Sequence, residues 1–257
     1  MTDLLGQARA LIPCAQVAGA REMVYFREGT EVIDKADGSP VTRADREAED
    51  IISKALADLF PGIPMVGEES VAAGIIPDIS GGTFWLVDPL DGTKEFITGS
   101  GDFTVNIALM RDFTPVMGVI YAPVTDTLYF GAEGQAFMRD GDGIERKINV
   151  RPVPAEGLTV VASKRHGDPA VLDQFLKGRK VAKMISRGSS VKFCCIAAGE
   201  ADFYPRLGPT CEWDTAAGEA ILRAAGGRVT MLDGKPFLYG KTAQKFLNPG
   251  FMALGAA

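Results

Sequence analysis

One segment predicts both the architecture and the chemistry of this chain: Phe84-Trp85-Leu86-Val87-Asp88-Pro89-Leu90-Asp91-Gly92-Thr93-Lys94-Glu95-Phe96. Its four leading apolar residues predict a buried strand that ends at two aspartates. Gly92 permits a positive φ and a tight turn, and Thr93 offers a hydroxyl where a helix or turn begins. Carboxylates at a strand end, joined by the backbone carbonyl of Leu90, can coordinate Mg²⁺. A helix N-terminus beside them favours a bound phosphate.

The two aspartates also fit an ordinary β-turn in which each carboxylate hydrogen-bonds its own backbone. Two further acidic segments favour a metal site. Glu68 follows a short predicted strand, and Asp214 precedes an Ala-rich helix. Each acid has a structural alternative, Glu68 as a solvated loop residue and Asp214 as a helix N-cap. The metal interpretation requires that acids between residues 68 and 214 gather around divalent cations.

A fourth segment has the spacing of a capping box, with Thr42 as the cap and Asp45 three residues later. Capping by itself accounts for both residues. A capping aspartate can also polarise a neighbouring hydroxyl, so a catalytic role for Asp45 stays open.

Composition narrows the chemistry. The chain has 257 residues, 46% of them apolar, and 27 Lys and Arg against 33 Asp and Glu. A net charge of −6 argues against a general nucleic-acid-binding surface, and an anionic ligand would need help from bound cations. The single histidine, His166, argues against zinc and copper centres, which draw on several His or Cys ligands. Any metal is therefore expected to be a hard cation held by oxygen.

Cysteine usage and hydropathy indicate a compartment. No apolar run approaches the roughly 18 to 20 residues of a membrane span. The first residues lack the basic start and apolar block of a secretory signal. The four cysteines are irregularly spaced, which is typical of reduced thiols. We expect a cytoplasmic protein; association with a membrane surface and the oligomeric state stay open.

Turn residues and periodicity predict the order of elements. Helices are predicted over 4–26, 43–60, 169–177, 190–198 and 215–225, with Ala48, Ile51, Ile52, Ala55, Leu56 and Leu59 buried in the second. Strands are predicted over 65–66, 84–87, 103–110, 116–121, 127–130, 134–138, 158–162, 183–186, 202–204 and 228–232. We expect a layered α/β fold in one functional unit, with a mainly antiparallel half (1–150) and an α/β half (151–257) that carries Asp214.

Three motifs resemble those of the lithium-sensitive, magnesium-dependent inositol monophosphatase superfamily: Gly67-Glu68-Glu69, the residues 88–93 and Trp213-Asp214-Thr215-Ala216-Ala217-Gly218. The similarity extends from residue 39 to residue 251. It is greatest to the bacterial 3′(2′),5′-bisphosphate nucleotidases, in residues 91–97, 103–109, 188–194 and 204–210. The resemblance implies an αβαβα five-layer sandwich. Cys211-Glu212 departs from the superfamily pattern without removing Asp214.

The same resemblance implies roles for individual residues. Two or three Mg²⁺ ions are expected. The metal ligands would be Glu68, Asp88, the carbonyl of Leu90, Asp91 and Asp214. Thr93, assisted by Asp45, would orient or deprotonate the attacking water, so these two are the expected catalytic residues. The substrate phosphate would meet Glu68, Leu90, Asp91, Gly92, Thr93 and Asp214.

A bisphosphate nucleotide also needs a second anion pocket. Ser189 lies at a predicted helix start with Lys192 in its first turn, and Arg206 could add a charge. An ordinary serine cap and two surface cations explain these residues equally well. His166 either contacts the nucleotide or is a structural or solvated histidine.

These features predict a phosphatase that removes the 3′-phosphate of adenosine 3′,5′-bisphosphate within sulfur metabolism; whether it also acts on the sulfated form stays open. An inositol or sugar phosphatase of the same superfamily is the alternative. A non-catalytic metal- or nucleotide-binding protein is less favoured, because every expected ligand and Thr93 are present. The expected partner is a small phosphorylated nucleotide, without nucleic acid or a transmembrane segment.

Overall fold

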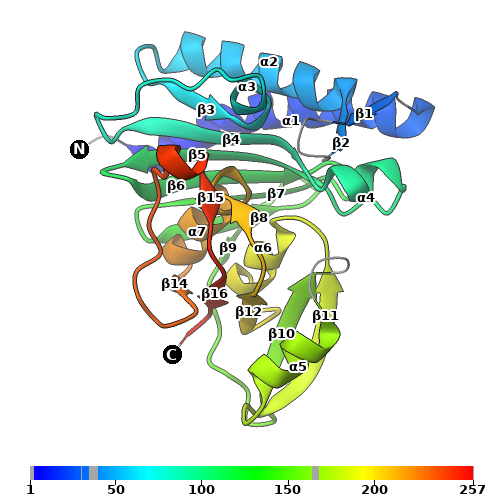
Figure 1. Cartoon of the computed structure of the whole chain (residues 1–257), viewed down its shortest axis with the longest axis vertical. Helices are drawn as coiled ribbons and strands as arrows, with labels where there is room; N and C mark the ends of the chain where they lie inside the picture. Colours follow the sequence, from blue (N-terminus) through cyan, green and yellow to red (C-terminus); the bar gives the residue numbers. More distant parts are fainter. Residues whose placement is uncertain (1–2, 30, 35–39, 164–167, 257) are drawn as a thin grey trace.

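The computed structural model describes residues 3–29, 31–34, 40–163 and 168–256. Helices and sheets alternate in five layers, which confirms the expected αβαβα sandwich (Figure 1). The first layer pairs α1 (Leu4–Glu28) with α2 (Arg43–Leu59) on a seven-stranded sheet. The middle layer is α6 (Val191–Ala197) and α7 (Trp213–Ala224). A five-stranded sheet follows, and α5 (Pro169–Leu176) packs on its outer side.

The larger sheet has the strand order of the sequence, and short turns join its consecutive strands from β5 to β9. All its pairs are antiparallel except β3 with β4. The strands are β3 (Met65–Gly67), β4 (Phe84–Asp91), β5 (Thr104–Arg111), β6 (Thr114–Ala122), β7 (Thr127–Ala132), β8 (Gln135–Arg139) and β9 (Glu145–Ile148). The mainly antiparallel pairing predicted for the first half is confirmed.

The smaller sheet has the order β11-β10-β12-β16-β14 and mixed pairing. Its strands are β10 (Leu158–Ser163), β11 (Val181–Arg187), β12 (Phe203–Arg206), β14 (Arg228–Met231) and β16 (Phe251–Leu254). The sequence analysis did not predict β16. This short apolar strand lies in the sheet between β12 and β14, which were both predicted. Short elements complete the chain: β1 (Val32–Asp34), β2 (Pro40–Thr42), α3 (Glu68–Ala72), α4 (Thr93–Ile97), β13 (Thr210–Cys211) and β15 (Leu247–Asn248).

The capping box predicted at the start of α2 is present: Thr42 accepts from the N–H of Ala44, and Asp45 accepts from the N–H of Thr42. Ala48, Ile52 and Leu56 are buried as predicted. The prediction for Leu59 is wrong, because α2 ends there and the side chain is 48% exposed.

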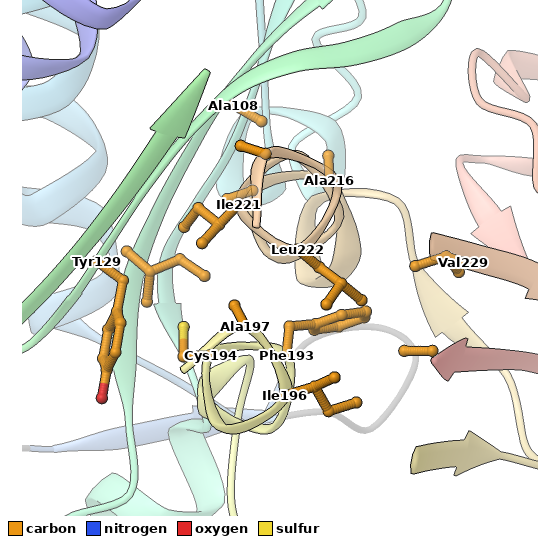
Figure 2. Packing of buried hydrophobic residues seen from close by; sticks show 14 of the residues in the cluster. Ala108, Tyr129, Phe193, Cys194, Ile196, Ala197, Ala216, Ile221, Leu222 and Val229 are labelled. Atoms are coloured by element: carbon orange, nitrogen blue, oxygen red, sulfur yellow. The ribbon is translucent and has the colours of Figure 1, made fainter. Parts of the chain in front are cut away.

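Helix α7 joins the two halves of the chain through one core. On one side it lies so close to β6 that a Cβ on Gly118 would stand 2.3 Å from the carbonyl oxygen of Ala217. On the other side, Leu222 packs toward Val229 of the smaller sheet (Figure 2). Residues from both sides of position 150 therefore share this cluster. All four cysteines carry free thiols.

No helix within the described ranges combines the length and the apolar character needed to cross a membrane.

Candidate active site

A pocket of about 230 Å³ lies where the ends of several elements meet. Of the acids singled out in the sequence, Glu68, Asp91 and Asp214 line this pocket, whereas Asp45 and Asp88 are buried and do not line it. The lining residues are Pro40, Glu68, Asp91, Gly92, Thr93, Lys94, Glu95, Ser163, Ser189, Ser190, Lys192, Phe193, Tyr204, Arg206, Thr210, Asp214, Thr215 and Phe251.

The parallel pairing of β3 with β4 brings Glu68 and Asp88 together. Gly67 is in register with Val87, so the residue that follows each lies at the same edge of the sheet. Asp88 is 1% exposed, and its Oδ1 accepts from the N–H of Leu90 at 3.0 Å. Burial raises the pKa of Asp88 well above its usual range, and the charges of Glu68, Asp91 and Asp214 raise it further. These four acids are therefore electrostatic neighbours.

Asp91 stands at the end of β4 and faces α6. Its Oδ2 accepts from the N–H of Ser190 at 2.5 Å and from the amide of Asn106 at 3.4 Å. Burial and the charge of Asp214 raise the pKa of Asp91 to about 7, although Lys192 opposes the shift.

Asp214 lies in the first turn of α7 and is not its N-cap, a position that Glu212 occupies. Its Oδ2 accepts from the Thr210 hydroxyl and, at 2.9 Å, from the N–H of Cys211. These bonds turn the carboxylate back toward the pocket. The N-cap alternative for Asp214 is therefore wrong.

The acids fit a hard cation by their chemistry. Every candidate ligand is an oxygen, and the like charges of the buried carboxylates raise one another's pKa in the absence of a counter-charge. The carboxylates are neighbours, yet within the described ranges no three His, Cys, Asp or Glu side chains already form a set that could hold a metal ion. Several carboxylate oxygens accept from protein donors instead, as those of Asp91 and Asp214 do.

Asp45 both caps α2 and contacts Thr93, so the two roles coexist. Its Oδ2 accepts from the N–H and the hydroxyl of Thr42, at 2.8 and 2.7 Å. Its Oδ1 accepts from the Thr93 hydroxyl at 3.3 Å. The Thr93 hydroxyl is also 3.3 Å from the carbonyl oxygen of Leu90. Gly92 precedes this turn with φ +100°, and a Cβ there would come within 2.9 Å of the carbonyl oxygen of Asp102.

The second group of predicted substrate residues, Ser189, Lys192 and Arg206, also lines the pocket. Lys192 is 4% exposed, so the surface-cation alternative is wrong for this residue. Its Nζ donates to the carbonyl of Ser189 and lies 5.3 Å from the ring centre of Tyr204. Burial lowers the pKa of Lys192 to about 8. Arg206 donates to the carbonyls of Gly208 and Pro209. His166 lies outside the described residues.

The sequence analysis missed residues that support or extend the site. Glu49 is buried in α2, and its carboxylate accepts from the N–H groups of Glu69 and Ser70, both at 2.8 Å, which fixes the start of α3 beside Glu68. Its spacing of one helical turn from Asp45 is the signal that could have found it. Tyr204 lies in the segment 204–210 that carries the resemblance, but no role was predicted for it.

A second, more apolar cavity of about 490 Å³ adjoins the first. The two cavities share Ser163, Tyr204 and Arg206. The second is lined by Ala162, Ser163, Asp168, Pro169, Val171, Leu172, Tyr204, Pro205, Arg206, Leu207, Gly208 and Pro209.

Comparison with known proteins places this geometry in a family. Residues 7–249 match the model of the inositol monophosphatase family. The 3′(2′),5′-bisphosphate nucleotidase CysQ of Escherichia coli (strain K12) is 46% identical over 221 residues, 86% of this chain and 87% of the relative. CysQ of Salmonella typhimurium is 46% identical over 233 residues, 91% and 89% of the two chains. The crystal structure of CysQ from Bacteroides thetaiotaomicron superposes with a TM-score of 0.81 and 38% identity over 98% of both chains. The chain belongs to the inositol monophosphatase family.

Proposed function

We propose that the protein is a phosphoric monoester hydrolase that removes the 3′-phosphate of adenosine 3′,5′-bisphosphate, giving AMP and phosphate. The observation that carries this proposal is the pocket itself, in which clustered acids and a buried lysine line the same space. The similarity to CysQ nucleotidases over most of the chain supports the substrate.

Members of this family are metal-dependent phosphatases that generally use Mg²⁺. In this chain Glu68, Asp88, the carbonyl of Leu90, Asp91 and Asp214 would hold two or three ions. When bound, the ions supply positive charge that activates water and stabilises the leaving oxygen. The carboxylates would otherwise repel the substrate phosphate, so the ions also reconcile an acidic pocket with an anionic ligand.

The Thr93 hydroxyl is suited to orient the attacking water. Its proton points to the carboxylate of Asp45 or to the carbonyl of Leu90, each 3.3 Å away, because both groups only accept. The Thr93 oxygen can then accept a hydrogen bond from water at the phosphorus. Attack by water needs no covalent enzyme intermediate.

The buried cation and the second cavity would bind the remainder of the substrate. Lys192 and Arg206, which line the pocket with Ser189, would provide positive charge for the 5′-phosphate. The adjoining apolar cavity would take the nucleoside, because it shares Tyr204 and Arg206 with the phosphate pocket. His166, in the segment between β10 and α5, would contact the nucleotide.

An inositol or sugar phosphatase is the second candidate. The family match favours it, since the family model is named for inositol monophosphatases. The paired cavities favour a longer ligand with two anionic groups.

Phosphate release from a substrate panel tests the proposal. The panel is adenosine 3′,5′-bisphosphate, its 5′-phosphosulfate analogue, AMP, inositol 1-phosphate and fructose 1,6-bisphosphate, each with Mg²⁺ and with added Li⁺. We expect the adenosine bisphosphate to give the highest kcat/KM and Li⁺ to inhibit. Comparable turnover of inositol 1-phosphate would favour the second candidate, and no turnover of any ester would favour a non-catalytic binding protein.

We also propose that the protein acts in the cytoplasm on this small-molecule substrate and does not act on nucleic acid. Its net charge of −6 supports the second point, because phosphate backbones are bound through basic surfaces.

A further inference from the structure

Two polar residues interrupt the apolar strand β5. Thr104 and Asn106 are both 0% exposed, although every other residue of the strand up to Met110 is apolar. They are two residues apart, so their side chains point to the same face of the sheet. The segment 103–109 carries part of the resemblance, and the proposed function gives neither residue a role. A buried hydroxyl and a buried amide are expected to be hydrogen-bonded, so their partners identify what this polar face supports.

A β-bulge in β4 brings two of the candidate metal ligands to that face. Asp88 is opposite Asn106, and Asp91 is opposite Thr104. The interval is three residues in β4 but two in β5, so β4 contains one extra residue there. Without the bulge, residues three apart would point to opposite faces. The two aspartates and the two polar residues of β5 therefore share one face of the sheet.

Asn106, Ser190 and Asp91 form a closed ring of hydrogen bonds. Ser190 donates its hydroxyl to Oδ1 of Asn106 at 2.7 Å and its N–H to Oδ2 of Asp91 at 2.5 Å. The amide nitrogen of Asn106 donates to the same Oδ2 at 3.4 Å. Ser190 is the N-cap of α6, yet its side chain makes no capping bond. Its hydroxyl therefore serves the ring and not the helix.

The direction of each bond follows from what each group can donate. An ionised Asp91, the form that binds a cation, only accepts, so Asn106 presents its amide nitrogen to it. The amide oxygen of Asn106 then faces Ser190 and accepts the proton of that hydroxyl. Thr104, whose hydroxyl lies 2.9 Å from that of Ser190, must consequently be the donor in that contact. The four groups thus have one consistent orientation.

Among the described residues, both printed donors to the Asp91 carboxylate meet Oδ2, which leaves Oδ1 for a cation. Asn106 carries no charge, so it can orient the carboxylate without competing with a cation as a lysine would. We propose that Asn106 is a positioning residue for the cation site: together with Ser190 it holds the Asp91 carboxylate between the end of β4 and the start of α6. The inference rests on the proposed role of Asp91 as a metal ligand.

Thermal unfolding at increasing Mg²⁺ concentration tests this role without measuring turnover. Asn106→Leu keeps the approximate volume and removes both polar groups, whereas Ser190→Ala removes the hydroxyl and keeps the N–H that bonds Asp91. We compare the Mg²⁺ concentration that raises the Tm by a fixed amount above its value in chelator. This Mg²⁺ requirement should increase about 10- to 100-fold in Asn106→Leu and about 3- to 10-fold in Ser190→Ala. The Mg²⁺ concentration that half-activates turnover should rise by the same factors.

A control and a double variant separate orientation of Asp91 from simple stability. Ile107→Val shortens the neighbouring side chain of β5, which is buried in the cluster with α1 and α2. It should lower the Tm in chelator and leave the Mg²⁺ requirement unchanged. A merely structural role for Asn106 would give that same pattern. The double variant Asn106→Leu/Ser190→Ala should need no more Mg²⁺ than Asn106→Leu, because the Ser190 hydroxyl acts through Asn106.

The outcomes are distinguishable. An unchanged Mg²⁺ requirement in either single variant overturns the inference, as do additive increases in the double variant, while the proposed function stands. If Asn106→Leu does not fold in chelator, Ser190→Ala decides by the same criterion. If the parent protein itself shows no rise in Tm with Mg²⁺, the metal-dependent reaction of the proposed function fails, and this inference fails with it.

Discussion

Replacing Asp91 with asparagine should stabilise the metal-free protein and abolish its response to Mg²⁺. Asp91 is surrounded by other acids, and burial together with the charge of Asp214 raises its pKa from 3.8 to about 7. Without a cation, the ionised Asp91 carboxylate destabilises the folded protein. With a cation bound, the same carboxylate is needed as a ligand.

The magnitude follows from the pKa. At 1.36 kcal/mol per pKa unit, the difference between 3.8 and about 7 corresponds to about 4 kcal/mol once the group is ionised in both states. Because the folded pKa is the higher one, folded protein binds more protons, and stability falls as pH rises from about 4 to about 7. Asp91 is only partly buried, and asparagine weakens the bond from the N–H of Ser190, so we expect a net gain of about 1–3 kcal/mol at about pH 8.

Thermal unfolding in the presence of a chelator measures this gain. For a chain of this size, 1 kcal/mol corresponds to about 2–4 °C in Tm. We expect Asp91→Asn to unfold several degrees above the parent at about pH 8 and at nearly the same temperature at about pH 4. Added Mg²⁺ should raise the Tm of the parent by mass action and leave that of the variant almost unchanged. Turnover should be lost.

Asp202→Asn is the matched control. Asp202 is also buried, but bonds from Arg151 and the N–H of Thr159 outweigh the effect of burial and lower its pKa. Its removal should therefore destabilise the protein at about pH 8 without changing the shift caused by Mg²⁺. The reasoning is refuted if Asp91→Asn is no more stable than the parent in chelator, or if it keeps the parent's Mg²⁺ shift and turnover.

Three further changes test other parts of the structure. Thr93→Val, which keeps the shape and removes the hydroxyl, should lower kcat about 10²- to 10³-fold while the Tm shift caused by Mg²⁺ persists; a kcat near that of the parent would contradict its role. Lys192→Met should lower kcat/KM for adenosine 3′,5′-bisphosphate about 10- to 100-fold, but should lower kcat/KM for adenosine 3′-monophosphate less than about threefold. An equal loss for both substrates would show that Lys192 does not bind the 5′-phosphate. Gly118→Ala should lower the free energy of unfolding in urea by about 2–4 kcal/mol, because the new Cβ would stand 2.3 Å from the carbonyl oxygen of Ala217. An unchanged urea midpoint would mean that α7 can shift freely away from β6.

Elements with a local cause could be predicted. The start of α2 is set by a capping box within four residues, and the buried face of the helix follows from the spacing of Ala48, Ile52 and Leu56. The apolar residues of β4 similarly predicted a strand. Where the cause is not local, prediction failed: β16 is a strand because β12 and β14 flank it, and nothing in its four residues requires that.

The sequence by itself determined the chemistry of the site: its oxygen ligands, its single threonine hydroxyl at a turn and the absence of several histidines. These are properties of residue types and short spacings. Only the tertiary structure decided how the residues meet. Parallel pairing of β3 with β4 sets Glu68 beside Asp88, and α7, lying between two sheets, carries Asp214 to them. Burial also lowered the pKa of Lys192 and raised that of Glu22 in α1, because desolvation depends on everything packed around a side chain and not on its neighbours in sequence.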